Sequence, residues 1–209
     1  LLGEDVRFEE RNETDASESY SDITFVPRVE SGCVVGFFSI AFDITVRKRL
    51  EAKLKEMADT DSLTGTLNRR EFAVRANIEL ERYKRTGKPF AFLIMDLDLF
   101  KRVNDTFGHS AGDEALRSLA DTCRKTIRPY DILGRFGGEE FMILMPDATE
   151  TGGRSLAERL RATVENTPVP TAAGEVRLTV SIGCTVVRPD DSLDDLLRRS
   201  DTALYESKN

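Results

Sequence analysis

The sequence predicts an α+β fold, an α/β sandwich in which helices flank a central mixed sheet of about five strands. Three observations support this class. The apolar run 90–95 is typical of a strand buried on both faces. From residue 59 onward, helix-type and strand-type segments alternate. Gly137 and Gly138 separate two strand-type runs, as the centre of a β-hairpin would.

Residues 1–46 predict a small antiparallel β segment ahead of this domain. Apolar and polar residues alternate in stretches such as 6–9 and 23–26, and a turn is expected at 30–32, which together indicate three strands. The longest apolar stretch, residues 33–42, is far shorter than the about 20 residues needed to cross a bilayer. We therefore expect no membrane contact from this chain.

Residues 47–58 predict a helix, because they are rich in strong helix formers. Its apolar positions, spaced by four, four and three residues on one face, are Val46, Leu50, Leu54 and Met57. Two interpretations stay open. The segment is either a signalling helix that pairs with a second chain or an amphipathic linker packed on its own domain, since fewer than two heptads are present.

Residues 59–209 predict the main domain. Asn68 is expected to cap its first helix, with Glu71 three residues later. The buried face of that helix would carry Phe72, Ala76, Leu80 and Tyr83. Asp98 is interpreted as the cap of a short helix that starts near Leu99. The remaining predicted elements are a helix over 112–127, the hairpin, a helix over 151–164, a strand over 176–186 and a helix over 193–208.

Two acidic clusters stand at predicted strand ends. Glu139 and Glu140 directly follow the Gly-Gly pair, and because successive strand side chains point to opposite faces, only one of them can join any given site. Taken alone, they are as consistent with a solvated turn as with a functional site. Asp96 and Asp98 end the buried strand. Since ligand sites in such sheets lie beyond strand ends, converging carboxylates would form an oxygen-lined site suited to Mg²⁺.

Composition excludes several partner classes. The formal charge is −7, but residues 1–47 hold ten acids against four bases, which leaves 27 acids against 26 bases elsewhere. Basic residues do not outnumber acidic ones, so the composition argues against a nucleic-acid partner.

Three widely spaced cysteines without a CxxC pair predict buried thiols in a reducing compartment. We expect a cytoplasmic location, with this chain as part of a longer protein that could be membrane-anchored upstream.

Four motifs follow one another at compatible spacing, namely 61–70 (DSLTGTLNRR), 96–109 (DLDLFKRVNDTFGH), 112–113 (GD) and 137–141 (GGEEF). Together they resemble the GGDEF family of diguanylate cyclases, over residues 59–209. Thr66 stands where a leucine is more usual in that family. Glu139 replaces the aspartate of the usual spelling with the same charge, and we expect activity to survive this change.

A second resemblance concerns the N-terminal part. The stretch 42–49, which begins Phe-Asp-Ile-Thr, is similar to the exit of PAS sensor domains, of which the last three strands would be present. The two resemblances imply three regions. Residues 1–46 would be the C-terminal part of a PAS-like sensor domain, 47–58 the signalling or linker helix, and 59–209 the GGDEF domain.

The GGDEF resemblance implies an activity. Two GTP molecules would condense into cyclic di-GMP plus two pyrophosphates at the interface of two such domains, so a homodimer would be needed for catalysis. Mg²⁺ or Mn²⁺ would be the cofactor. The alternative is a catalytically weak module that senses cyclic di-GMP or GTP. Loss of Gly138, Asp96 or Glu139 would have favoured that alternative, and none is lost.

The resemblance also implies residue roles. Metal ligands would be Asp96, the backbone carbonyl of Leu97, Glu139 and Glu140. Glu139 and Lys101 would be the catalytic residues, with Glu139 as proton acceptor. Lys101 would also bind the substrate. The other residues that would contact its phosphates or line its site are Arg135, Gly137, Gly138 and Lys208.

Base choice would rest on Asn104 and Asp113. A carboxylate can accept hydrogen bonds from N1–H and the 2-amino group of guanine at once, while an amide offers one donor and one acceptor to the remaining edge. The pair therefore favours guanine over adenine.

Arg128 and Asp131 match an RxxD pattern that ends five residues before the GGEEF motif. In this family the pattern forms an inhibitory site for the product, so cyclic di-GMP would be an inhibitor here, with Arg159 as a second arginine. Guanidinium groups pair bidentately with phosphate or with the Hoogsteen edge of guanine. The alternative is a surface Arg–Asp ion pair.

Overall fold

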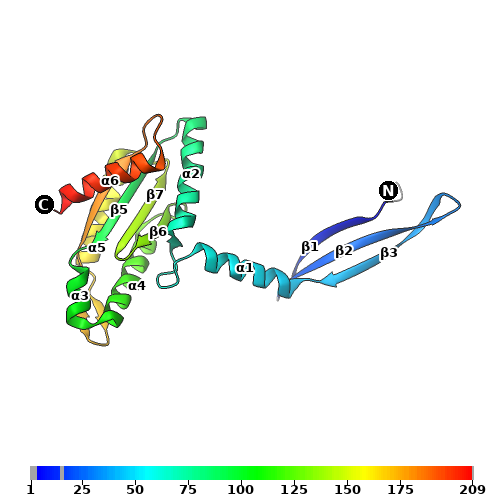
Figure 1. Ribbon diagram of the computed structural model, residues 1–209, viewed down its shortest axis with the longest axis horizontal. Helices are drawn as coiled ribbons and strands as arrows, with labels where there is room; N and C mark the ends of the chain where they lie inside the picture. Colours follow the sequence, from blue (N-terminus) through cyan, green and yellow to red (C-terminus); the bar gives the residue numbers. More distant parts are fainter. Residues whose placement is uncertain (1–3, 15–16, 209) are drawn as a thin grey trace. The chain divides into compact units, whose positions relative to one another are not determined.

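The computed structural model describes residues 4–14 and 17–208 and divides into two compact units, Leu1–Ala58 and Asp59–Asn209 (Figure 1). The first unit is an antiparallel sheet of β1 (Val6–Thr14), β2 (Ser17–Glu30) and β3 (Cys33–Asp43), in that order. The three predicted strands are thus confirmed. Ser31 and Gly32 form the β2–β3 turn with φ of 51° and 80°, the left-handed values that a tight hairpin turn requires.

Helix α1 (Thr45–Asp59) continues directly from this sheet, as predicted. Hydrogen bonds fix the junction: the backbone N–H of Thr45 donates to the Asp43 carboxylate at 2.8 Å, and the Thr45 hydroxyl accepts from the Tyr20 N–H at 2.9 Å. The hydrogen bonds that the Asp43 carboxylate accepts from the Thr45 side chain and backbone lower the pKa of Asp43. The likeness to a PAS domain exit stays a prediction.

The first unit exposes many apolar side chains. On α1 the four predicted stripe residues are between 56% and 71% exposed, namely Val46, Leu50, Leu54 and Met57. On β3, Phe37, Phe38 and Phe42 are exposed as well. Cys33 is also exposed, so the prediction of buried thiols is wrong for this residue, which lies at the start of an edge strand. Cys123 is buried and Cys184 is half-buried, and all three are free.

The second unit is built on a five-stranded mixed sheet in the order β10-β5-β7-β6-β4, which confirms the predicted fold class. Its β4–β6 pair is parallel, and its other pairs are antiparallel. The strands are β4 (Leu67–Asn68), β5 (Phe90–Leu97), β6 (Ile132–Gly137), β7 (Glu140–Pro146) and β10 (Val180–Val186). The helices are α2 (Arg69–Thr86), α3 (Phe100–Phe107), α4 (His109–Thr126), α5 (Glu150–Glu165) and α6 (Leu193–Ser207).

Two apolar layers sandwich this sheet. Alternate residues of β5 point to opposite faces, so Phe92 packs with α2 and α6, whereas Leu93 packs with α4 and α5 (Figure 1). The near-continuous burial of β5 explains why its sequence is apolar without alternation. Helix α2 starts as predicted, with the Asn68 side chain accepting from the Glu71 N–H at 3.0 Å.

Two predicted element boundaries and one predicted helix cap were wrong. The helix expected from residue 112 begins at His109. The strand expected over 176–186 is divided, because β9 (Gly174–Val176) pairs with β8 (Val169–Thr171) in a separate hairpin. Asp98 does not cap α3: the cap position is taken by Leu99, in the left-handed conformation at φ 56°, with no side-chain cap bond. The Asp98 carboxylate instead accepts from the hydroxyls of Thr179 and Ser181, both at 2.8 Å.

None of the helices among the described residues is long and apolar enough to cross a bilayer.

Helix α6 lies very close to β10 at Gly183. A Cβ built at Gly183 would lie 2.1 Å from the carbonyl oxygen of Ser200 and 2.5 Å from the backbone N of Leu204. Both atoms belong to the helix backbone, so a methyl group could be accepted only if α6 moved.

We therefore predict that Gly183→Ala destabilises the second unit by about 3 kcal/mol, the upper end of typical overpacking costs. Gly152→Ala is the matched control. Its Cβ would meet nothing closer than Thr149 Oγ1 at 3.8 Å, and Gly152 lies in the first turn of α5, so its stability should be unchanged or slightly higher. Urea unfolding followed by circular dichroism measures both, and equal stability of the two variants would contradict the packing described.

Candidate active site

The β6–β7 hairpin presents the acidic pair at its tip. Gly137 pairs with Glu140, so the two central turn residues are Gly138 and Glu139, one position later than the predicted Gly-Gly centre. Gly138 has φ 52°, which glycine adopts without steric cost. The hairpin is confirmed, and its shift places Glu139 in the turn itself, where its direction is not set by the strand alternation.

Three acidic side chains meet at this end of the sheet. Asp96 near the end of β5 is the direct cross-strand partner of Glu140 at the start of β7. Side chains of such partners lie within a few ångströms of each other. The backbone N–H of Leu97 donates to the carbonyl of Glu139 at 3.3 Å, which ties the turn to the strand that carries Asp96.

Negative charge accumulates here. Burial raises the pKa of Glu140, and the neighbouring carboxylates of Asp96, Asp201 and Glu139 raise it further, while Lys208 acts in the opposite direction. The Lys208 ammonium lies 2.7 Å from Oδ1 of Asp96. Lys208 thus offsets part of the negative charge at this end of the sheet.

The donor set suits Mg²⁺ or Mn²⁺. Within residues 4–14 and 17–208, no three His, Cys, Asp or Glu side chains are arranged closely enough to hold a metal ion alone. Mg²⁺, however, is usually bound by one or two carboxylates together with substrate phosphates and water. The carboxylates of Asp96, Glu139 and Glu140, with Lys208 as the one cation paired to them at Asp96, offer hard oxygen ligands of that kind, and so the residues present fit the ion.

Arg135 secures the hairpin tip. Its Nε and Nη2 donate to the Gly138 carbonyl at 2.9 and 2.6 Å, and its Nη1 donates to the Asp61 carboxylate at 3.0 Å. Asp61 also accepts from the Thr64 N–H and hydroxyl at 2.9 and 2.7 Å. Although burial acts to raise it, the pKa of Asp61 is lowered by these bonds from Thr64 and Arg135.

Asp61 is a structural site residue that the sequence analysis missed. It was noted only as the first letter of the 61–70 motif. The signal was the spacing of Asp61 and Thr64, because an Asp side chain that accepts from the backbone a few residues on is typical of a turn. The motif loop and the acidic hairpin are therefore joined through one guanidinium group.

The packing of α3 on α4 places Asn104 beside Gly112, the residue that precedes Asp113. A Cβ at buried Gly112 would lie 1.9 Å from Oδ1 of Asn104, so the amide side chain occupies the space that glycine leaves open. Asp113 follows Gly112 directly and is exposed. Lys101 lies one turn before Asn104 on α3 and is exposed too.

The RxxD segment forms a turn between α4 and β6. The Asp131 carboxylate accepts from the backbone N–H of Arg128 at 2.9 Å, and the Arg128 guanidinium lies near the Tyr130 ring. The other oxygen of Asp131 is buried without a hydrogen-bond partner, and burial raises the pKa of Asp131 despite the nearby charges of Arg128 and Arg159. The expected alternative, a surface ion pair, is thus not how Asp131 is engaged.

Comparisons with known proteins agree with the predicted resemblance. The family model "Diguanylate cyclase, GGDEF domain" matches residues 58–209. Diguanylate cyclase DgcM of Escherichia coli is 40% identical over 170 residues, 81% of this chain and 41% of that protein. The response regulator PleD of Caulobacter vibrioides is 38% identical over 166 residues, 78% of this chain and 36% of PleD. The chain spans about two fifths of the length of these curated relatives.

Solved structures give the same result. Diguanylate cyclase SiaD of Pseudomonas aeruginosa, in complex with its activator SiaC, has a TM-score of 0.71 at 36% identity, covering 78% of this chain and 63% of SiaD. The coiled coil and GGDEF domain of DgcB from Caulobacter crescentus, in complex with cyclic di-GMP, has a TM-score of 0.73 at 28% identity, covering 78% and 86%. On the matched motifs, fold and family model, this chain belongs to the GGDEF domain family of diguanylate cyclases.

Proposed function

We propose that the chain condenses two GTP molecules into cyclic di-GMP and two pyrophosphates. The observation that carries this proposal is the pairing of Asp96 with Glu140 across β5 and β7, beside Glu139 in the turn. Such a concentration of carboxylates is destabilising by itself and becomes useful when a metal–nucleotide complex neutralises it. The relatives named above support the same activity, and GTP as substrate fits a cytoplasmic location.

Asp96, the Leu97 carbonyl, Glu139 and Glu140 would hold Mg²⁺ or Mn²⁺. When bound, the ion would neutralise the charge of the triphosphate and make the attacking ribose hydroxyl more acidic. Lys208 is 2.7 Å from Asp96 before substrate arrives. We propose that it moves from this carboxylate to the phosphates once a cation takes its place.

The reaction needs a proton acceptor and a leaving-group path. The 3′-oxygen of one GTP attacks the α-phosphorus of the other, its proton passes to Glu139, and the bond to the β-phosphate oxygen breaks to release pyrophosphate. A second, equivalent step closes the ring. Lys101, exposed and without an ion-pair partner among the described residues, is free to neutralise the departing pyrophosphate.

Arg135 has a different part in this proposal. The resemblance implies a phosphate contact, but its Nε, Nη1 and Nη2 all donate hydrogen bonds to Gly138 or Asp61. We assign Arg135 as a positioning residue that fixes the position of the turn residues Gly138 and Glu139. Any phosphate contact would use the donor hydrogens that remain.

Guanine selection would rest on Asn104 and Asp113. The close fit of the Asn104 amide over Gly112 fixes this side chain next to the residue that precedes Asp113, and the two side chains together would complement the donor and acceptor pattern of guanine. Product inhibition would use the RxxD turn, with Arg128, Asp131 and Arg159 near one another.

Catalysis would require a homodimer. One site as described offers one guanine-binding pair, and the product contains two guanosine units. Two domains must therefore face each other, each presenting one GTP. The exposed apolar stripe of α1 is the surface that we propose pairs the chains.

The first prediction about function concerns Glu139→Gln. The amide keeps the shape but neither accepts the proton nor contributes charge to the metal, so cyclic di-GMP formation should fall at least about 100-fold. Glu81→Gln, on exposed α2 surface, is the control and should retain full turnover. Product is measured by chromatography and folding by circular dichroism. Undiminished turnover in a folded Glu139→Gln protein would sink the assignment.

The second prediction concerns Arg128→Ala. Losing one guanidinium should weaken cyclic di-GMP binding at least about tenfold while synthesis persists. Lys125→Ala removes the same charge from the end of α4 and should leave affinity unchanged. Isothermal titration calorimetry compares them, and equal affinities in all three proteins would remove the RxxD site from the account.

The third prediction concerns assembly. Specific activity should rise with enzyme concentration in the dilute range, and a parallel coiled coil fused ahead of Arg47, in register with the stripe, should raise it further. Replacing Leu50 and Leu54 together by Glu should lower activity at a given concentration. Lys55→Glu changes the net charge equally, by −2, and serves as control. Flat specific activity in a protein shown to be monomeric throughout would contradict the two-domain mechanism.

A further inference from the structure

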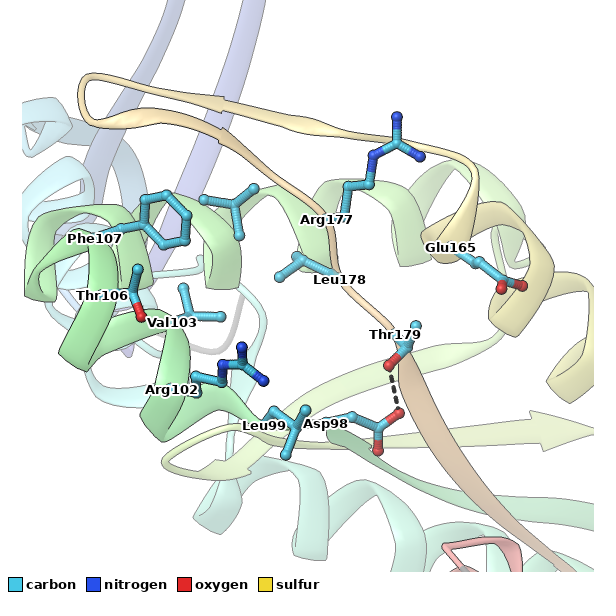
Figure 2. A pocket seen from close by; sticks show the side chains of 11 residues that line it. Asp98, Leu99, Arg102, Val103, Thr106, Phe107, Glu165, Arg177, Leu178 and Thr179 are labelled. Atoms are coloured by element: carbon cyan, nitrogen blue, oxygen red, sulfur yellow. Dashed lines mark hydrogen bonds between the residues drawn. The ribbon is translucent and has the colours of Figure 1, made fainter.

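A cavity of about 560 Å³ lies on the side of α3 that bears Arg102 and Val103. Its walls are the Asp98–Leu99 connection, α3 itself, the segment from Val176 to Thr179 that enters β10, and Glu165 at the end of α5 (Figure 2). This volume is in the range of sites for small organic ligands. None of the residues assigned above to metal, GTP or product lines it.

The floor of the cavity is apolar. Val103, Val176 and Leu178 are each at most 9% exposed, and their packing fixes the shape of the floor. The full set of apolar lining residues is Leu99, Val103, Phe107, Val176 and Leu178. Such a surface offers burial to a hydrocarbon chain or a ring, at roughly 25 cal/mol per Å² of apolar area removed from water.

The acidic groups at the rim are already engaged. The Asp98 carboxylate accepts from the Thr179 and Ser181 hydroxyls, and Figure 2 shows it turned toward Thr179. Glu165 pairs with Arg161 at 2.8 Å. The charge of Glu165 is therefore paired, whereas Asp98 keeps its charge and directs its oxygens toward two hydroxyl donors.

The basic groups at the rim are not engaged in this way. Arg102 extends from α3 toward the cavity and has no hydrogen-bond or ion-pair partner among residues 4–14 and 17–208 (Figure 2). Arg177, on the opposite rim, reaches only Glu175 at 3.7 Å with its side chain 78% exposed, an arrangement that contributes little and breaks easily. Among the described residues, Arg102 thus flanks the apolar floor without an ion-pair partner, and Arg177 flanks it with only a weak one.

We propose that this cavity binds a small organic anion that carries an apolar chain or ring, such as a medium-chain carboxylate. The anionic group would pair with the Arg102 fork, which matches carboxylate geometry bidentately, and Arg177 would close over it. The apolar part would cover Val103, Val176 and Leu178. Helix α3 carries Lys101 and Asn104 as well as cavity residues, so the ligand site and the proposed GTP site share this element.

The test uses decanoate, below its micelle concentration, with the whole chain and isothermal titration calorimetry. Arg102→Ala should weaken binding by about tenfold, the loss expected for one charge-assisted pair at a partly exposed site. Arg117→Ala is the matched control, because Arg117 is an exposed arginine on neighbouring α4 with no partner among the described residues, and it should bind as the wild type does. Decyltrimethylammonium, with the same chain and opposite charge, should bind at least tenfold more weakly than decanoate.

The exposed apolar strands of the first unit could also take up decanoate, so the location is measured directly. In methyl-labelled protein, decanoate should shift the resonances of Leu99, Val103, Val176 and Leu178, and these shifts should shrink in Arg102→Ala. Two results would overturn the proposal. One is equal decanoate affinity in the wild type and Arg102→Ala; the other is shifts confined to first-unit methyl groups such as Val34 and Val35.

Discussion

Repulsion between carboxylates at one end of the sheet is the constraint on which the site depends. Strand pairing places Asp96 opposite Glu140, and the turn adds Glu139; burial raises the pKa of Glu140, and the charges of Asp96 and Glu139 raise it further. Cations must therefore stand nearby. Lys208 contacts Asp96 at 2.7 Å, and Arg135 braces the turn that carries Glu139. A metal–nucleotide complex would also neutralise these carboxylates. The charge that has to be balanced when this edge of the sheet folds is therefore the charge that the proposed chemistry would use.

Much of the fold could be predicted because burial leaves a trace in the sequence, either a continuous apolar run where both faces of a strand are covered or a period where one face of a helix is. The apolar run of β5 and the 3.6-residue spacing on α2 both follow directly from which faces are buried. The β8–β9 hairpin was missed because two strands of three residues leave no such period. The role of Asp98 was misassigned, since helix capping is a local rule and its partners Thr179 and Ser181 are about eighty residues away.

The parts of the site that lie in short sequence motifs could be predicted. Asp96 and Glu139 could be chosen because they follow a buried strand and a glycine turn. The hydrogen bonds of Arg135 to Asp61 and Gly138 could not be predicted. Arg135 and Asp61 are 74 residues apart, and these bonds depend on the hairpin already being folded. The cavity beside Arg102 left no motif either, since its floor is made by packing between distant elements.

The central claim is that this acidic edge makes cyclic di-GMP rather than only binding nucleotides. The most direct measurement incubates the purified chain with GTP and Mg²⁺ and identifies every product by chromatography and mass spectrometry. The account predicts cyclic di-GMP and pyrophosphate in a ratio of one to two, and no cyclic product from ATP. GTP that binds but stays intact, or that is only hydrolysed to GDP and phosphate, would contradict it.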